Sequence, residues 1–528
     1  MPLYLRRSAG PPLRPNMKTR WKILIGLAAV LVIVVLGAVA HHFQLKAAVN
    51  RYRAELKAKG EPVELVEVIP PPVPSNENWV QLFTNAILLL NTNNSVLSSN
   101  EPSMMRMVAP GKAMVGWQQP DVRQYGATNS WAEINAAIKE EQSALDLLHT
   151  LPFQPIFDFK LNYADGLGKM RISPLASAKK AVLRLRTSAV NHLQHGEVDL
   201  AGKDILVMLA IDNGFSHDRT LISELVRIAI AQISLTASWD WLQASGIKEA
   251  QLAAVQQSWE NLEFIQPFLN SMAIERVGGA TEVRALRDSG LEAYFDSFNK
   301  LGLFDTDEGF ISTLKVKYKS TLWRYWWSYP DELRELKAIQ YVVEAGRQAK
   351  TNNSFMEANK DLKTKIESLG IKSDDDDIFW LKDPAKMDFH LIISSSLNAF
   401  ERSFNKVMKV EAARAMTITA IALKRYQIKH RDYPSDLDSL VPEFIATVPR
   451  DPVDGQPLRY RRNADGSFLL YSVGENGVDD GGNPSSEKGV TGSYYSWQDS
   501  HALDWVWPQP ATAEEVQKYY QAHAKKSK

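Results

Sequence analysis

The sequence predicts a mainly α-helical protein with an N-terminal transmembrane helix, an α-helical hairpin or bundle body and a small C-terminal α+β module. Three observations support this fold class. An uncharged apolar run extends from Ile23 to Ala40, apolar residues recur at helical spacing over 174–265, and short strand-like segments rich in proline and glycine follow residue 430. With 528 residues, 45% of them hydrophobic, the chain is long enough for more than one globular unit.

Overall composition excludes several classes of function. Lys and Arg together number 61, as do Asp and Glu, so the formal net charge is zero and we expect no nucleic-acid partner. The absence of cysteine excludes disulfides, thiolate nucleophiles and zinc–cysteine sites. A chain without thiols suits an oxidising, exported compartment without fixing it.

The N-terminal region predicts a membrane anchor. Residues 1–22 form a basic tail without an acid, and the 18 uncharged residues from Ile23 to Ala40 span about 27 Å as a helix, close to the roughly 30 Å of a bilayer core. Positive charge before the span predicts a single-pass protein of the bacterial inner membrane, with a cytoplasmic N-terminus and residues 41–528 periplasmic. The competing interpretation is a signal peptide cleaved after Ala38-Val39-Ala40, but 18 apolar residues are long for one. Met17 is an alternative start.

Next come a stalk and a helical body. Residues 41–75 read as a helical extension and a proline-rich linker, and 76–385 as the body. Within the body we expect a long loop over 91–126, a new helix from about Ser130, four helices in antiparallel hairpins over 174–265, and further helices over 266–300 and 330–369. Residues 212–214, an Asp-Asn-Gly sequence, are expected to break the chain between two of these helices.

Region 386–510 is predicted to be a long helix, ending near His430, followed by a β module. Two short strands, around 459–461 and 468–472, flank the hairpin turn at 463–466. Residues 511–528 read as a last helix with a basic tail.

Turn and strand motifs in 420–507 carry a family resemblance. In chain order they are Tyr433-Pro434, Val448-Pro449-Arg450-Asp451-Pro452, Gly455-Gln456-Pro457-Leu458-Arg459-Tyr460, the stretch from Phe468 to Gly477, and Asp504 before Trp505. Together they resemble the globular domain of the major pseudopilins of type II secretion. The span from Ile23 to Ala40 lacks the Glu that a pseudopilin membrane helix carries, so we expect no pilin-like processing. The whole chain resembles exported bacterial proteins that join a helical body to this module, which implies no activity.

The resemblance implies a structural calcium ion in the acidic loop, which we define as residues 472–482. By position, Val473 offers its carbonyl, and Asn476 and Asp504 stand where two Asp ligands lie in the family. Glu475, Asp479 and Asp480 add carboxylates on a glycine-rich turn, and calcium favours such oxygens. The predicted metal residues are Val473, Glu475, Asn476, Asp479, Asp480 and Asp504. The alternative is a solvated acidic turn.

Three other groups are candidate sites. Trp323, Tyr325, Trp326 and Trp327 form the densest aromatic run, which can bind a glycan, a peptide or a membrane surface, or can fill a core face. His192 and His195 lie one helical turn apart, but their place at a helix end favours a structural role over metal binding. The four aspartates at 374–377 read as a solvated loop, with a cation site as the alternative.

The function predicted from these features is that of a membrane-anchored, exported structural or interaction protein of the bacterial envelope. The specific hypothesis is association with a type II secretion or pilus-like assembly, beside the lipid bilayer that holds residues 23–40. The first alternative is a periplasmic glycan- or peptide-binding protein that uses 323–330, and the second is a hydrolase built from scattered Asp, Glu and His. Common catalytic motifs such as G-x-S-x-G and H-E-x-x-H are absent from the sequence, and we predict no catalytic residue.

Overall fold

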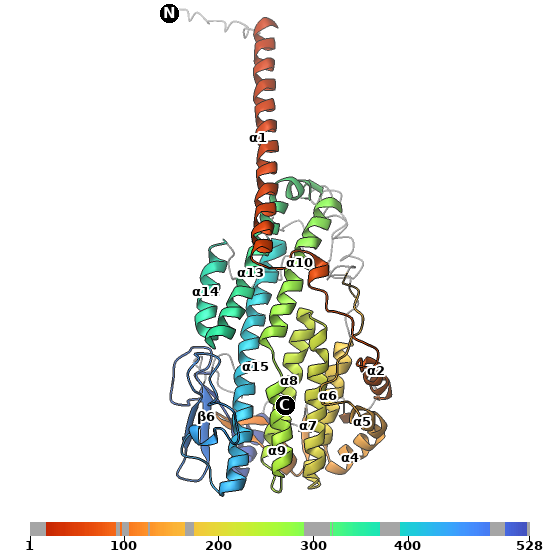
Figure 1. The fold of residues 1–528 in the computed structure, drawn as a ribbon, viewed down its shortest axis with the longest axis vertical. Coiled ribbons are helices and arrows are strands. Elements are labelled where there is room, and N and C mark those ends of the chain that lie inside the picture. The colour runs from red at the N-terminus through yellow and green to blue at the C-terminus, as the bar shows by residue number, and fades with distance from the viewer. Residues whose placement is uncertain are drawn as a thin grey trace, which may run out of the picture.

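The computed structural model describes residues 17–90, 96–97, 105–124, 127–163, 170, 174–289, 317–318, 320–369, 391–485 and 502–524. A long N-terminal helix projects from a helical body that carries a small β module at its far end (Figure 1). The mainly α class is therefore confirmed. The four aspartates at 374–377 and the boundary at 385/386 lie outside the described residues.

Helices form most of the described chain. They are α1 (Met17–Ala58), α2 (Val80–Leu89), α4 (Trp131–Glu140), α5 (Gln142–Leu148), α6 (Leu175–Gln194), α7 (Val198–Gly214), α8 (Leu221–Leu242), α9 (Glu249–Asn261), α10 (Ile265–Ser289), α13 (Ser328–Asn352), α14 (Phe355–Glu367), α15 (Leu391–His430) and α16 (Ala513–Ala524). The strands are β1 (Arg106–Ala109), β2 (Lys112–Met114), β3 (Val122–Gln124), β4 (Ala127–Asn129), β5 (Arg459–Arg462), β6 (Phe468–Ser472), β7 (Trp505–Val506) and β8 (Gln509–Pro510).

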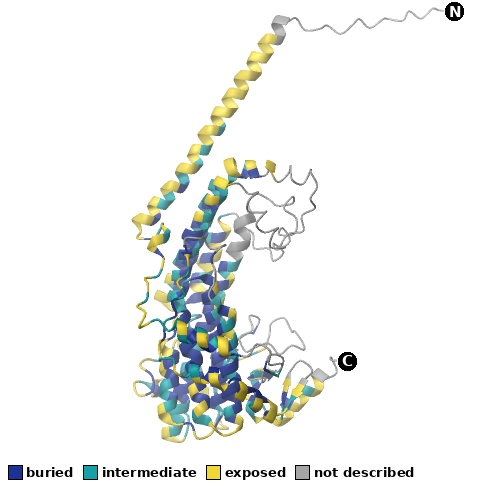
Figure 2. Cartoon of the chain, turned by 90° about the vertical axis from the view of Figure 1, so that its right-hand side faces the viewer, coloured by how far each residue is buried: buried dark blue, intermediate teal, exposed yellow. Residues whose placement is uncertain are grey.

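Helix α1 begins at Met17 in the predicted basic tail, runs through the predicted anchor and continues without a break to Ala58, as the charged sequence after residue 40 suggests. Its apolar part is long and apolar enough to cross a membrane and is not buried by the body (Figure 2). Farther along, Val49 and Leu56 are buried against Ala280 of α10 and Leu336 of α13. The helix therefore joins its exposed apolar part directly to the packed body.

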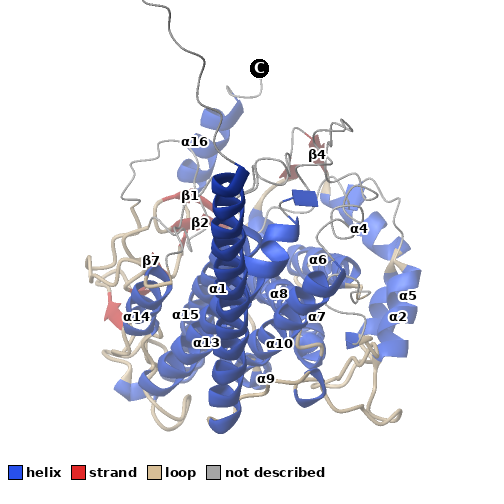
Figure 3. Cartoon of the chain, turned by 90° about the horizontal axis from the view of Figure 1, so that it is seen from above, coloured by secondary structure: helices blue, strands red, loops and turns tan. Residues whose placement is uncertain are grey.

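Helix α8 lies at the centre of the body, where it packs against α6, α7, α10 and α15 (Figure 3). It also passes a test of length and hydropathy for a membrane span, yet 61% of its apolar window is buried in the protein. Trp239 and Trp241 are fully buried, and their indole N–H groups donate to the carbonyls of Pro508 at 3.0 Å and Val198 at 3.1 Å. These contacts identify α8 as a core helix.

Two local expectations are wrong. The loop predicted over 91–126 contains β1, β2 and β3, because β2 pairs antiparallel with β1 and also parallel with β8 near the end of the chain. Residues 212–214 form the last turn of α7 rather than a break, since Asp212 is buried against the Arg227 side chain, whose Nε lies 3.1 Å from Asp212 Oδ1.

Region 391–507 follows the predicted order of a long helix and a small sheet. Helix α15 has 40 residues, about 60 Å of length, and packs against α8, α9 and α13. Strands β5, β6 and β7 form an antiparallel sheet, and the amide of Asn463 donates to Ser467 O at 2.8 Å in the predicted hairpin turn. Among the described residues, one large apolar cluster includes side chains from Phe83 to Trp507, so body and module share a core.

Candidate functional site

The C-terminal module, residues 420–507, lies at the end of the body opposite α1 (Figure 1). Two backbone bonds join it to the start of α14, from the amide of Phe355 to Pro452 O and from Met356 to Val453 O, both at 2.9 Å. Gly455, with φ +76°, lies so close to Asn353 that a Cβ there would be 3.0 Å from its carbonyl oxygen. The module is therefore fixed against the α13–α14 connection.

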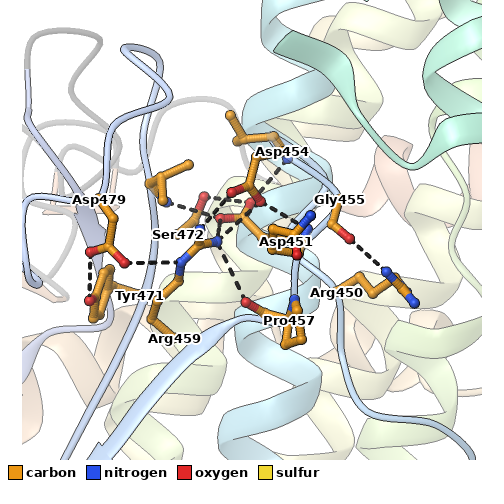
Figure 4. Close-up of polar contacts among 12 residues, drawn as sticks. Arg450, Asp451, Asp454, Gly455, Pro457, Arg459, Tyr471, Ser472 and Asp479 are labelled. Atoms are coloured by element: carbon orange, nitrogen blue, oxygen red, sulfur yellow. Dashed lines mark hydrogen bonds and ion pairs between the residues drawn. The ribbon is translucent and has the colours of Figure 1, made fainter. Parts of the chain in front are cut away.

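A buried aspartate organises the module (Figure 4). The carboxylate of Asp451 accepts hydrogen bonds from the amides of Val453 and Val473, both at 3.0 Å, and from Ser472 Oγ at 2.8 Å. Burial raises the pKa of the Asp451 carboxyl, while the bonds from the two amides and the hydroxyl oppose that rise. This side chain ties the turn after Pro449 to strand β6.

Arg459 on β5 faces three carboxylates (Figure 4). Its guanidinium lies 3.1 Å from Asp451, 2.5 Å from Asp454 and 3.5 Å from Asp479. The hydrogen bond to Asp454 raises the pKa of Arg459, although partial burial opposes the rise. The single guanidinium of Arg459 therefore pairs with carboxylates of the 451–455 turn and of the acidic loop. We call Arg459, Asp451, Asp454 and Asp479 the acidic corner.

Three of the predicted calcium residues lie next to one another. Asn476 Nδ2 donates to Asp480 Oδ2 at 3.1 Å, and the Asp480 amide lies 3.4 Å from Asp504 Oδ1. Asp504, fully buried, also accepts from the amides of Gly482 at 2.8 Å and Asn483 at 2.9 Å. Side-chain oxygens of this kind are ligands that calcium takes, but those of Asn476 and Asp504 accept hydrogen bonds from nearby backbone amides here.

The other predicted metal residues are directed elsewhere. Asp479 accepts from the Tyr471 hydroxyl at 2.9 Å and faces Arg459, and Glu475 lies 3.2 Å from Lys409 Nζ on α15. The Val473 amide donates to Asp451, and its carbonyl, the predicted ligand, stays a prediction. Within the described ranges, no three His, Asp or Glu side chains are placed together to hold a metal ion. Calcium in this loop stays a prediction.

The aromatic run divides between core and surface. It forms a π-helical turn, Trp323–Trp327, in which Trp323 is buried and donates from Nε1 to Asp331 Oδ2 at 2.8 Å. Tyr325 and Trp326 are 54% and 41% exposed, whereas Trp327 is half-buried. Core packing therefore accounts for Trp323, and Tyr325 and Trp326 remain candidates for binding.

His192 and His195 do not converge on one point. His192 Nδ1 lies 2.5 Å from Glu197 Oε2, and His195 Nδ1 lies 2.8 Å from the carbonyl of Asn191 at the end of α6. These partners fit the structural role expected at a helix end.

Sequence reasoning missed a charged site where the stalk meets the body. Glu61, 5% exposed, accepts from Gln340 Nε2 at 3.1 Å, from Arg276 at 3.3 Å and from Arg347 Nη2 at 3.1 Å. Burial alone would raise the pKa of Glu61, but bonds from Arg347 and Gln340 and the charge of Arg276 lower it to about 2. We call Glu61, Arg276, Gln340 and Arg347 the joint. Glu61 lies more than 200 residues in sequence from the other three members, so no local motif reveals the joint.

Comparison with known protein families, curated proteins and solved structures found no match. The fold itself defines a mainly α protein with an N-terminal helix able to serve as a membrane anchor or a signal sequence.

Proposed function

We propose that the protein is a membrane-anchored, exported structural or interaction component of the bacterial envelope. The observation that carries the proposal is the unbroken course of α1 from its exposed apolar part into the packed body. A tether meant only to retain a protein near a bilayer needs no such packing. A helix buried at Val49 and Leu56 instead fixes the position and direction of everything attached to it.

The joint supports the same proposal because it closes the connection at the point where α1 ends. Gly60, with φ +78°, turns the chain, and Glu61 then bonds Arg276 of α10 and Gln340 of α13. Arg276, only 1% exposed, also donates to Pro62 O at 3.0 Å. A buried charge with several directed partners holds one geometry more strictly than apolar contact does.

We further propose that the C-terminal module is the part that binds the assembly. It lies at the end of the body away from the anchor, and α15 extends about 60 Å along the body toward it (Figure 1). The resemblance of 420–507 to pseudopilins supports a component of a type II secretion or pilus-like assembly as the partner. The exposed Val478, on the acidic loop, offers an apolar contact at this end.

The test is site-specific photo-crosslinking in the membrane. A photoreactive residue at Val478 is expected to capture an assembly component, whereas one at Ile222, which is 50% exposed on α8, is not. Alkaline extraction should leave the full chain in the membrane pellet, and protease added outside spheroplasts should degrade residues beyond 41. Release by alkali would contradict the anchor. Equal crosslinking at Val478 and Ile222 would contradict the module as the binding surface.

A structural calcium ion in the acidic loop is proposed as a second element of this function. Asn476, Asp480 and Asp504 would hold it, and the ion would supply positive charge to a loop that carries more acid than base. We expect EDTA to lower the unfolding temperature of the full chain, and Asp480→Asn to weaken that response. Asp438→Asn, at an exposed carboxylate outside the loop, should leave it intact. An unchanged melt together with no bound ion by mass spectrometry would refute the proposal.

A further inference from the structure

The exposed aromatic residues of the Trp323–Trp327 turn lie beside α1 at the level where its apolar run ends. The ring centroid of Trp326 is 5.8 Å from that of His41, the first residue after Ala40. His42 Nδ1 lies 3.1 Å from the carbonyl oxygen of Tyr325, and its ring is 5.2 Å from Tyr329. Two segments almost 300 residues apart thus meet at one height along the anchor.

That height corresponds to a membrane boundary if α1 spans the bilayer. The 18 apolar residues before His41 cover about 27 Å, and a hydrocarbon core is about 30 Å thick. The layer of lipid headgroups begins there and adds roughly 5–8 Å on each side. Trp326, in contact with His41, therefore lies at the level of the headgroups.

Aromatic side chains are suited to this layer, since Trp and Tyr are enriched where apolar rings meet a polar, hydrated boundary. Tyr325 and Trp326 are more than 40% exposed in the protein alone, and Phe43 on the neighbouring turn of α1 is 62% exposed. Large aromatic groups left exposed together mark a contact surface. Here the contact surface adjoins α1, the proposed membrane anchor.

The turn is held rigidly, which a docking surface needs. Trp323 is fixed in the core through Asp331, and Arg287 Nε donates to Ser328 Oγ at 2.8 Å. The Arg287 guanidinium also lies 3.8 Å from the centroid of the Tyr329 ring. The π-helical turn widens the helix locally, and its inner Trp323 and outer Tyr325 and Trp326 point to different environments.

We propose that Tyr325, Trp326 and Phe43 form a second membrane contact, in which the body rests on the headgroup layer of the bilayer that α1 spans. The inference rests on the proposed anchor. It assigns the exposed aromatic residues to a lipid surface rather than to a glycan or peptide, because their neighbours are the residues that immediately follow the apolar run. With α1 and this contact together, the body has two points of attachment and a fixed orientation on the membrane.

The absence of cysteine allows single-cysteine labelling of the full chain for a direct test. Four single-cysteine variants each carry one fluorophore. The label is on the aromatic turn in Tyr325→Cys and just after the apolar run in Phe43→Cys. It is within the anchor in Leu31→Cys, and on α14, away from the anchor, in Met356→Cys. All four positions are at least 40% exposed, so labelling should not disturb the core. Each labelled protein is reconstituted into phospholipid vesicles that carry nitroxides on the headgroup or deep in the acyl chain.

We expect headgroup nitroxide to cause the same loss of fluorescence at Tyr325 and Phe43, deep nitroxide to quench Leu31, and neither to quench Met356. Trp326→Cys should repeat the result for Tyr325. Quenching at Leu31 but not at Tyr325 or Trp326 would overturn the inference and leave the anchor intact. No quenching at Leu31 would overturn both. Binding of a soluble glycan that Trp326→Ala abolishes, without lipid quenching, would overturn the inference in favour of the glycan-binding alternative.

Discussion

The joint and the acidic corner of the C-terminal module have opposite ratios of acidic to basic side chains. At the joint, one carboxylate, Glu61, lies between two guanidiniums, Arg276 and Arg347. In the module, one guanidinium, Arg459, faces three carboxylates. The first site has a surplus of positive charge and the second a surplus of negative charge.

The two sites respond to protons in opposite directions. Arg347, Gln340 and Arg276 together lower the pKa of Glu61 to about 2 despite its burial, whereas burial raises the pKa of Asp451. Acid therefore removes a favourable charge from the joint, but relieves an unfavourable one in the module.

The largest expected effect is that of Glu61→Ala. It leaves Arg276 buried without a carboxylate, and breaking a buried pair in this way costs about 3–5 kcal/mol of unfolding free energy. Urea unfolding of the full chain measures the loss. Glu64→Ala is the matched control, because Glu64 pairs with Arg53 but has a 60% exposed side chain, and it should cost no more than about 1 kcal/mol. Equal losses would show that the joint contributes little.

Arg459→Met should have the next largest effect and should act on the module. Asp451 keeps its amide and hydroxyl donors but loses its charged one, a loss of about 1.5–3 kcal/mol. Amide hydrogen exchange should rise in β5 and β6 while α10 and α13 stay protected. Arg462→Met, on the same strand but with an exposed partner in Asp432, should change little. Faster exchange in α10 or α13 would contradict a local role for Arg459.

A smaller effect is expected from acid. Since the pKa of Glu61 is depressed in the folded protein, its stabilisation is complete above about pH 4.5 and is lost as the pH falls toward about 2. Glu61→Gln removes the titration and should flatten the dependence of unfolding temperature on pH between 4.5 and 2. Parallel curves for the two proteins would assign acid sensitivity to other groups.

The smallest effect tests how the module is attached. Gly455→Ala and Gly466→Ala both place a side chain at positive φ, which costs about 1–2 kcal/mol. Only at Gly455 does the new Cβ meet another segment, the carbonyl oxygen of Asn353 at 3.0 Å, whereas Gly466 faces open space. We expect Gly455→Ala to lower the free energy of unfolding, measured in urea, by about 1 kcal/mol more than Gly466→Ala does. Equal losses of unfolding free energy in the two variants would mean that the α13–α14 connection is not fixed against the module.

Structural elements that depend on residues close together in the sequence could be predicted from it. The apolar helix, α6, α8, α9 and the β5–β6 hairpin follow from residue spacing and turn residues within one segment. Asp240 shows what could not be predicted. It is fully buried and accepts from the amides of Met105 at 3.2 Å and Gly116 at 3.0 Å, more than 120 residues away. The β1–β2 strands that it holds were read as a loop for the same reason.

The acidic loop shows a similar limit within a site. Position along the motif placed six residues in one candidate set, and the structure brings Asn476, Asp480 and Asp504 together. Sequence position could not show that Glu475 faces Lys409 on α15, or that Asp479 faces Arg459. The oxygens that remain for a metal ion depend on which carboxylates the fold already pairs with Lys or Arg side chains.

Helix α8 has a consequence for how the chain reaches its place. A translocation channel tests each segment for release into the bilayer, and α8 is hydrophobic enough to resemble a stop signal. Its Glu224, Arg227 and Asp240 disfavour that release, since charged side chains are costly within a membrane-crossing helix. If α8 stopped there, everything beyond it would remain on the starting side. Under the proposed export, these charges therefore allow α8 to cross the membrane completely. They form their buried contacts afterwards, when the protein folds.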